Sequence, residues 1–125
     1  MRELLERQAR QWDEHGLSLW WWRERATGEL VGMGGLNRAE VEGEPCVEVG
    51  WSLPTHRHDQ GFATELGRAS IEWGRAELGL ERIVAFTLPE NERSRAVMER
   101  LGMTYVRDFR RKGLPHVLYE APATG

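Results

Sequence analysis

The chain has 125 residues, of which 40% are hydrophobic and 30% are charged, with a formal net charge of −3. These values predict a single globular domain over residues 1–125 and disfavour nucleic acid and anionic membranes as partners. No apolar run approaches the roughly 20 residues of a membrane span, and residues 1–12 lack the apolar core of a signal peptide. The single cysteine, Cys46, excludes an internal disulfide and indicates a reducing, cytoplasmic setting.

The first third of the chain predicts a helix followed by a hairpin. Residues 3–15 place apolar side chains at helical spacing, and a His-Gly pair would end that helix. Residues 17–36 contain two strand-like runs around a central turn, with Trp20 and Trp22 on one face of the first run. The polar residues 37–44 indicate a loop.

The rest of the chain alternates strands and helices. Residues 46–53 alternate, with Val47 and Val49 on one face and Glu48 on the other. Further predicted elements are a helix over 61–78, a strand over 82–88, a helix over 93–101 and strands over 103–111 and 116–121. The apolar stripe of the longer helix comprises Phe62, Leu66, Ala69, Trp73 and Ala76. A strand–helix–strand crossover makes its two strands parallel, so the order predicts an α/β fold with mixed strand directions.

The turn before the longer helix reads HRHDQGFATE. A helix N-terminus carries unpaired amides and partial positive charge, and after a strand it can hold an anion. Gly61 and Ala63 are small enough to let a ligand approach the backbone. The alternative is that Gly61 only shapes the corner. The turn is neither a Walker A loop nor a dinucleotide fingerprint, because the lysine of the first and the glycine spacing of the second are missing.

Three ordered motifs resemble the GNAT superfamily of acyl-CoA-dependent N-acyltransferases, in its RimJ/RimL-like ribosomal-protein acetyltransferase branch. The acyl-CoA motif of that family is similar to VEVGWSLPTHRHDQGFATELGRASIEWG, its following segment to LPENERSRAVMERLGMTYV, and its central hairpin to TGELVGMGGL. The resemblance covers almost the whole chain. It implies a GNAT-like mixed, mostly antiparallel sheet with a splayed parallel strand pair, flanked by helices.

The resemblance also implies an activity and a cofactor site. An acetyl group would move from acetyl-CoA to a primary amine, on a protein N-terminus or a small molecule, by direct attack in a ternary complex. Amides of the turn would hold the CoA pyrophosphate, and the splayed strand would pair with the pantetheine arm. The cofactor-binding residues implied are Trp51, Ser52, Leu53, His58, Asp59, Gln60, Gly61, Phe62, Ala63, Thr64, Asn91 and Ser94.

The chain departs from the family pattern at three positions. His58 replaces the usual Gln or Arg, and Asp59 stands where glycine is common, which is unfavourable beside a pyrophosphate unless the carboxylate points outward. Met98 occupies the position of a tyrosine that serves many GNAT enzymes as general acid. The departure at Asp59 leaves open an alternative function, a catalytically weak CoA-binding or assembly module.

Two residues are candidates for catalysis. Glu48 could act as the base that keeps the attacking amine neutral, or could be a structural carboxylate paired with an arginine. Ser94 could orient the CoA thiolate, or could serve in capping the helix at 93–101. A metal site formed by His56, His58 and Asp59 fits by spacing alone, and no metal is expected.

The segment before the hairpin is short for this branch, whose members usually begin with a further strand and helix. An uncovered strand edge over residues 17–25 would then invite pairing with a second copy, so a homodimer is expected. The sequence does not identify the acceptor amine.

Overall fold

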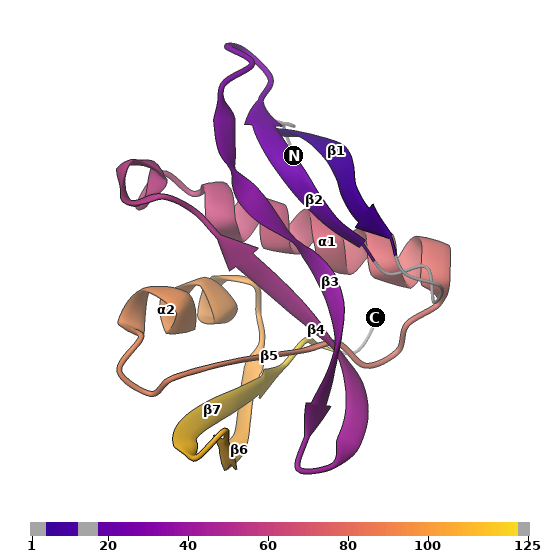
Figure 1. The fold of residues 1–125 in the computed structure, drawn as a ribbon, viewed down its shortest axis with the longest axis vertical. Helices are drawn as coiled ribbons and strands as arrows, with labels where there is room; N and C mark the ends of the chain where they lie inside the picture. Colours follow the sequence, from indigo (N-terminus) through magenta and orange to yellow (C-terminus); the bar gives the residue numbers. More distant parts are fainter. Residues whose placement is uncertain (1–4, 13–17, 123–125) are drawn as a thin grey trace.

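The computed structural model describes the backbone of residues 5–12 and 18–122 and the side chains of residues 20–122. Its strands are Leu5–Trp12 (β1), Ser18–Glu24 (β2), Leu30–Val41 (β3), Glu44–Ser52 (β4), Val84–Thr87 (β5), Thr104–Arg111 (β6) and Leu114–Glu120 (β7). Its helices are the short 3₁₀ helix Thr55–Arg57 (η1), Phe62–Leu78 (α1) and Glu92–Arg100 (α2). The strands form one sheet in the order β1-β2-β3-β4-β5-β7-β6, antiparallel except between β4 and β5 (Figure 1). The expected mixed, mostly antiparallel α/β fold is confirmed.

The segment Leu5–Trp12 is a strand, so the helix predicted over residues 3–15 is wrong where the structure describes it. β1 pairs antiparallel with β2 along its length. Its apolar spacing is compatible with either conformation, and hydrogen bonding to the edge of β2 decides for the strand, because a short isolated helix is marginal without packing. The helix end predicted at His15-Gly16 lies outside the described residues.

β1 also covers the edge that was expected to be open over residues 17–25. That prediction is wrong, so the edge of β2 does not favour a homodimer. The edge strands of the described sheet are β1 and β6. β6 exposes Tyr105 and Val106 but carries a register shift between Tyr105 and Arg107, a common feature of edges that resist further pairing.

β3 and β4 form one long hairpin that includes most of the residues predicted as a loop. Pairing continues to Val41↔Glu44, so the loop predicted over 37–44 shrinks to the two-residue turn Glu42-Gly43. Both turn residues have positive φ, 52° and 84°, which matches the twist of a two-residue hairpin. The hairpin end is polar because it is largely exposed, and Val41 is the buried residue near the turn.

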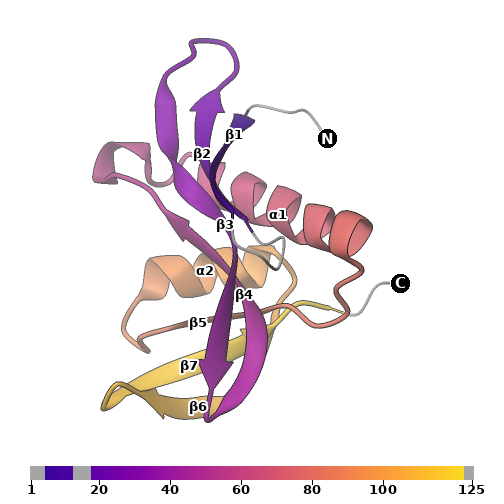
Figure 2. The ribbon, with the colours of Figure 1, turned by 45° about the vertical axis from the view of Figure 1, so that its right-hand side comes forward.

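β4 and β5 pair at one position and then separate. The parallel contact is Glu48↔Val84, and beyond it β5 is paired with β7 on its other side. Figures 1 and 2 show the two strands running apart from this point, with α2 beside the opening. The end of β4, from Val49 to Ser52, therefore has no strand partner on this edge among the described elements. The predicted splayed parallel pair is confirmed.

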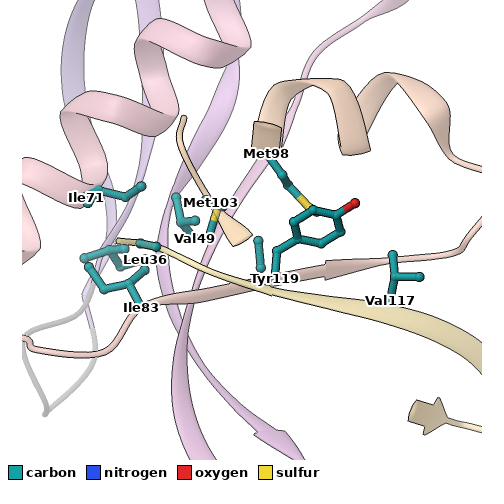
Figure 3. Close-up of a cluster of buried hydrophobic side chains, with 10 residues drawn as sticks. Leu36, Val49, Ile71, Ile83, Met98, Met103, Val117 and Tyr119 are labelled. Atoms are coloured by element: carbon teal, nitrogen blue, oxygen red, sulfur yellow. The ribbon is translucent and has the colours of Figure 1, made fainter. Parts of the chain in front are cut away.

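Both helices pack on the same face of the sheet. Figure 3 shows Ile71 of α1 beside Val49 of β4, and Met98 of α2 above Tyr119 of β7. The buried residues of this core are Leu36, Val49, Ile71, Ile83, Ala85, Met98, Met103, Val117, Tyr119 and Ala121. A neighbouring cluster holds Trp20, Trp22, Val31, Phe62 and Leu66. The two clusters fix α1 and α2 relative to β4, and so position the ends of both helices.

α1 lies close to its neighbours because two glycines face them. A Cβ added to Gly67 would lie 2.8 Å from Leu101 Cδ1, and one added to Gly74 would lie 2.6 Å from Leu36 Cδ1. The apolar stripe predicted for this helix is buried at its start, at Phe62 and Leu66, but Ala76 at its end is exposed. Among the described residues, no helix is long and apolar enough to cross a membrane.

On the opposite face, the end of the β3–β4 hairpin contacts β6. Arg107 donates to Glu42 at the hairpin turn, with Nη2 2.6 Å from Oε1. The contact encloses a small third cluster of Val41, Val84, Phe109 and Leu118. The sheet is therefore curled, and β5 is buried on both faces near the point where it separates from β4.

Candidate functional site

A pocket of about 270 Å³ lies where β4 separates from β5. It is bounded by the end of β4, the loop from β4 to α1, the first turn of α1 and one face of α2. Its lining residues are Trp51, Ser52, Leu53, Arg57, His58, Asp59, Gly61, Phe62, Ala63, Thr64, Asn91, Arg93, Ser94, Val97 and Arg100. Every predicted cofactor residue except Gln60 is in this set. The Gln60 side chain instead donates to the carbonyl oxygen of His56, 3.0 Å away.

The N-terminus of α1 opens into this pocket without a side-chain cap. Gly61 occupies the N-cap position with φ 83° and ψ 0°, in the left-handed region where glycine is favoured. It offers no side-chain acceptor to the first amides of the helix, which also lack carbonyl partners within the helix. A Cβ added at Gly61 would meet nothing within 4 Å. The geometry therefore presents free amide groups and open space at the same point.

Buried polar atoms without partners gather around the pocket. Among the described residues, four buried side-chain atoms lack a hydrogen-bond partner, and three of them belong to pocket residues: Arg57 Nε, His58 Nδ1 and Thr64 Oγ1. The other ring nitrogen of His58, Nε2, donates to the carbonyl oxygen of Leu53, 2.9 Å away. Because unpaired buried polar groups are unfavourable, their concentration at one place indicates a ligand that supplies partners.

Arg57 holds the loop between β4 and α1 to the β2–β3 hairpin. Its side chain is 10% exposed and donates to Glu24, with Nη1–Oε1 3.1 Å, and to Glu29, with Nη2–Oε1 2.9 Å. Its guanidinium also lies 5.7 Å from the centre of the Phe62 ring. Sequence reasoning missed this residue, because its partners lie about thirty positions earlier and no local pattern marks the contact.

Asp59 points outward and is paired. It has φ 62°, and its carboxylate, 78% exposed, accepts from Arg93 of α2, with Oδ2–Nη2 3.2 Å. The ion pair joins the loop to α2 and offsets the negative charge that made Asp59 an unfavourable neighbour for a phosphate. No metal-binding group of His, Cys, Asp and Glu is present among the described residues, so the spacing of His56, His58 and Asp59 does not produce one there.

Asn91 is the residue that caps α2. Its Oδ1 accepts from the backbone N–H of Ser94 at 3.1 Å, and its Nδ2 donates to Thr87 Oγ1 at 3.0 Å. The hydroxyl of Ser94 makes no hydrogen bond with the described residues and lines the pocket. The capping role considered for Ser94 therefore belongs to Asn91, while Ser94 contributes only its backbone amide to the cap.

Glu48 lies outside the pocket, at the closed end of the opening between β4 and β5. It is three residues before Trp51, about 10 Å along the strand. Burial raises the pKa of Glu48, and the positive charge of Arg111 lowers it in part. The side chain of Glu48 makes no hydrogen bond or ion pair within the described residues, which removes support for a structural salt bridge. Met98, at the position of the family tyrosine, is 2% exposed in the core.

Comparison with known proteins identifies the family. The family model described as an acetyltransferase (GNAT) domain matches residues 1–104. An uncharacterized Bacillus subtilis protein, YkkB, is 29% identical over 123 residues, covering 92% of this chain and 72% of that protein. The FsC-acetyl coenzyme A-N(2)-transacetylase of Aspergillus fumigatus is 31% identical over 110 residues, covering 83% of this chain and 44% of the fungal protein.

A solved structure shares the fold. A putative GNAT-family acetyltransferase from Bordetella pertussis superposes with a TM-score of 0.74 at 23% identity, covering 85% of this chain and 66% of that one. The chain thus spans less than half of the fungal relative and about two thirds of the bacterial structure.

The raised pKa of Glu48 predicts how its neutral replacement changes stability. In acid the carboxyl is protonated in both the folded and the unfolded chain, so Glu48→Gln and wild type should have similar melting temperatures. As pH rises past the ordinary value of 4.5, the unfolded chain ionises first, and wild type should lose stability until the folded pKa is passed. Glu48→Gln should therefore melt at a higher temperature than wild type at about pH 8, by scanning calorimetry.

Glu44→Gln, at an exposed position of the same strand, is the matched control. The change in its melting temperature between acid and about pH 8 should equal that of wild type. A Glu48→Gln variant that is less stable than wild type at neutral pH would contradict the desolvation argument and favour a structural role for the carboxylate.

Proposed function

Because the chain belongs to the GNAT acetyltransferase family, in its RimJ/RimL-type group, we propose that it transfers an acetyl group from acetyl-CoA to a primary amine. The observation that carries this proposal is the pocket at the separation of β4 and β5, into which the uncapped N-terminus of α1 opens. Parallel strands that remain paired leave no such space, so the separation makes room for a ligand beside the free edge of β4.

The pocket residues fit CoA group by group. Amides at Gly61–Thr64 suit the pyrophosphate, because they combine unpaired donors with the positive end of the α1 dipole. The free edge of β4 at Trp51–Leu53 suits the amide groups of the pantetheine arm. The unpaired atoms His58 Nδ1 and Thr64 Oγ1 would gain partners from the same ligand. When bound, acetyl-CoA supplies the thioester, an activated acyl group.

The amine nitrogen attacks the thioester carbonyl, a C–N bond forms, and the C–S bond breaks with its electron pair on sulfur. The proton that the nitrogen loses as the amide forms goes to the departing thiolate. An ammonium group cannot attack, so a proton must first move from the acceptor to a base. We assign this role to Glu48, acting through water because the strand places it about 10 Å from the nearest pocket residue on β4. Its half-buried carboxylate and raised pKa suit that task. Ser94, whose hydroxyl is free, is assigned to orient the departing sulfur.

The acceptor class is a primary amine, and its identity is a separate question. The fungal relative is named FsC-acetyl coenzyme A-N(2)-transacetylase, which supports transfer to a nitrogen atom, and a small-molecule amine is one candidate acceptor. A protein N-terminus is the other, from the ribosomal-protein branch that the motifs resemble. The remaining alternative is a CoA-binding module without turnover. Release of free thiol from acetyl-CoA in the presence of a panel of amines separates it from an enzyme.

The first prediction of this function concerns Gly61. Gly61→Val should lower the affinity for CoA at least tenfold by calorimetry, because a branched side chain would stand in front of the free amides, and each factor of ten is about 1.4 kcal/mol. Gly43→Val is the control. Gly43 has φ 84°, close to the 83° of Gly61, and also faces open space, but it lies in the β3–β4 turn. Equal CoA affinity in both variants would mean that the backbone at Gly61 does not bind the pyrophosphate.

The second prediction separates Ser94 from the helix cap. Ser94→Ala should lower kcat about tenfold and leave the melting temperature unchanged, because its hydroxyl has no partner within the described chain. Asn91→Ala should lower the free energy of unfolding by about 1 kcal/mol, since it removes the cap. If Ser94→Ala retains full kcat, the hydroxyl has no role in the reaction.

The third prediction tests Glu48 as the base. Glu48→Gln should lower kcat about 100-fold near neutral pH, because a proton acceptor is lost while the shape is kept. Raising the pH should restore part of the rate, since the amine then loses its proton to solvent. In wild type, kcat/KM should fall as pH drops below the raised pKa of Glu48. A pH–rate profile of Glu48→Gln that runs parallel to wild type would exclude the base role.

A further inference from the structure

Three arginines line the pocket, and they differ in how their charge is compensated. Arg57 is buried between Glu24 and Glu29, and Arg93 is paired with Asp59. The guanidinium of Arg100 forms no hydrogen bond or ion pair with the described residues. Arg100 is therefore the pocket arginine whose charge is not already offset by a neighbouring carboxylate.

Arg100 is held in place beside α1. It is the last residue of α2, and its carbonyl oxygen accepts from Arg68 of α1, with Nη2–O 3.2 Å. The next residue, Leu101, lies against Gly67 in the second turn of α1. Arg93 and Arg100 are seven residues apart, two helical turns, so both lie on the face of α2 that lines the pocket. Arg100 marks the end of this face opposite Asn91.

CoA carries a pyrophosphate and a separate 3′-phosphate, and the two need different partners. The pyrophosphate suits the α1 amides, whereas the 3′-phosphate on the ribose is a monoester that is largely dianionic at neutral pH and lies beyond the pyrophosphate. A planar guanidinium is the side chain best matched to such a group, because it donates two parallel hydrogen bonds to phosphate oxygens. The amides at Gly61–Thr64 cannot serve both phosphates at once.

We infer that Arg100 binds the 3′-phosphate of CoA and makes the pocket select CoA over dephospho-CoA. The inference rests on the proposed function, since it takes CoA as the ligand. Arg93 already donates from Nη2 to Asp59, 3.2 Å away, so Arg100 is the better candidate for this role. Arg68 is a positioning residue, which fixes the end of α2 through the carbonyl oxygen of Arg100.

The test compares CoA with dephospho-CoA, which lacks only the 3′-phosphate, by titration calorimetry at two salt concentrations. Wild type should bind CoA about tenfold more tightly, and Arg100→Gln should lose that preference by weakening CoA binding while leaving dephospho-CoA within about twofold. The CoA affinity of wild type should depend more steeply on salt than that of Arg100→Gln. Arg93→Gln is the matched control on the same helix face and should keep the preference.

Two results would overturn the inference while leaving the proposed function intact. Equal loss of affinity for both ligands in Arg100→Gln would mean that the side chain either binds the pyrophosphate or stabilises the fold. A lowered melting temperature of the variant would indicate the second role. Retention of the full CoA preference in Arg100→Gln would place the 3′-phosphate elsewhere. Failure of wild type to bind either ligand would instead contradict the proposed function, and the inference with it, so the two failures are distinguishable.

Discussion

The separation of β4 from β5 beyond the Glu48↔Val84 pair is the feature on which the candidate site depends. A parallel pair that stayed in register would bury the edge of β4 in hydrogen bonds and leave no space beside Trp51–Leu53. The sheet stays continuous because β3 holds β4 on one side and β7 holds β5 on the other. Helices packed on one face, and the curled hairpin on the other, keep the opening from collapsing.

The same opening brings together groups whose environments differ. The amides of α1 and the arginines of α2 make the pocket favourable for anions, although the chain as a whole is negative. At the closed end, Glu48 is a half-buried carboxylate whose raised pKa means that the fold would be more stable with it neutral. Retaining an ionisable group where it is unfavourable for stability is typical of functional sites.

Much of the candidate site could be predicted from the sequence because its signals are local. The alternation around Glu48 and the small residues Gly61 and Ala63 depend on neighbours within a few positions. Strand β4, helix α1 and the motif turn therefore appeared where expected, and nearly all predicted ligand residues line one pocket. The cap of α2 was local as well, and it falls on Asn91 rather than Ser94 because the Asn91 side chain reaches the third helical amide.

By itself the sequence determined the periods of β4 and α1 and the chemistry of the turn between them, since backbone conformation and small side chains act over short distances. Only the tertiary structure decided that Leu5–Trp12 is a strand, because the open edge of β2 outweighs a helical pattern in a short segment. The tertiary structure also decided which pocket arginines are paired with a carboxylate. The sequence alone does not distinguish Arg57, Arg93 and Arg100. The carboxylates that pair with Arg57 and Arg93 come from distant parts of the chain, and among the described residues none pairs with Arg100.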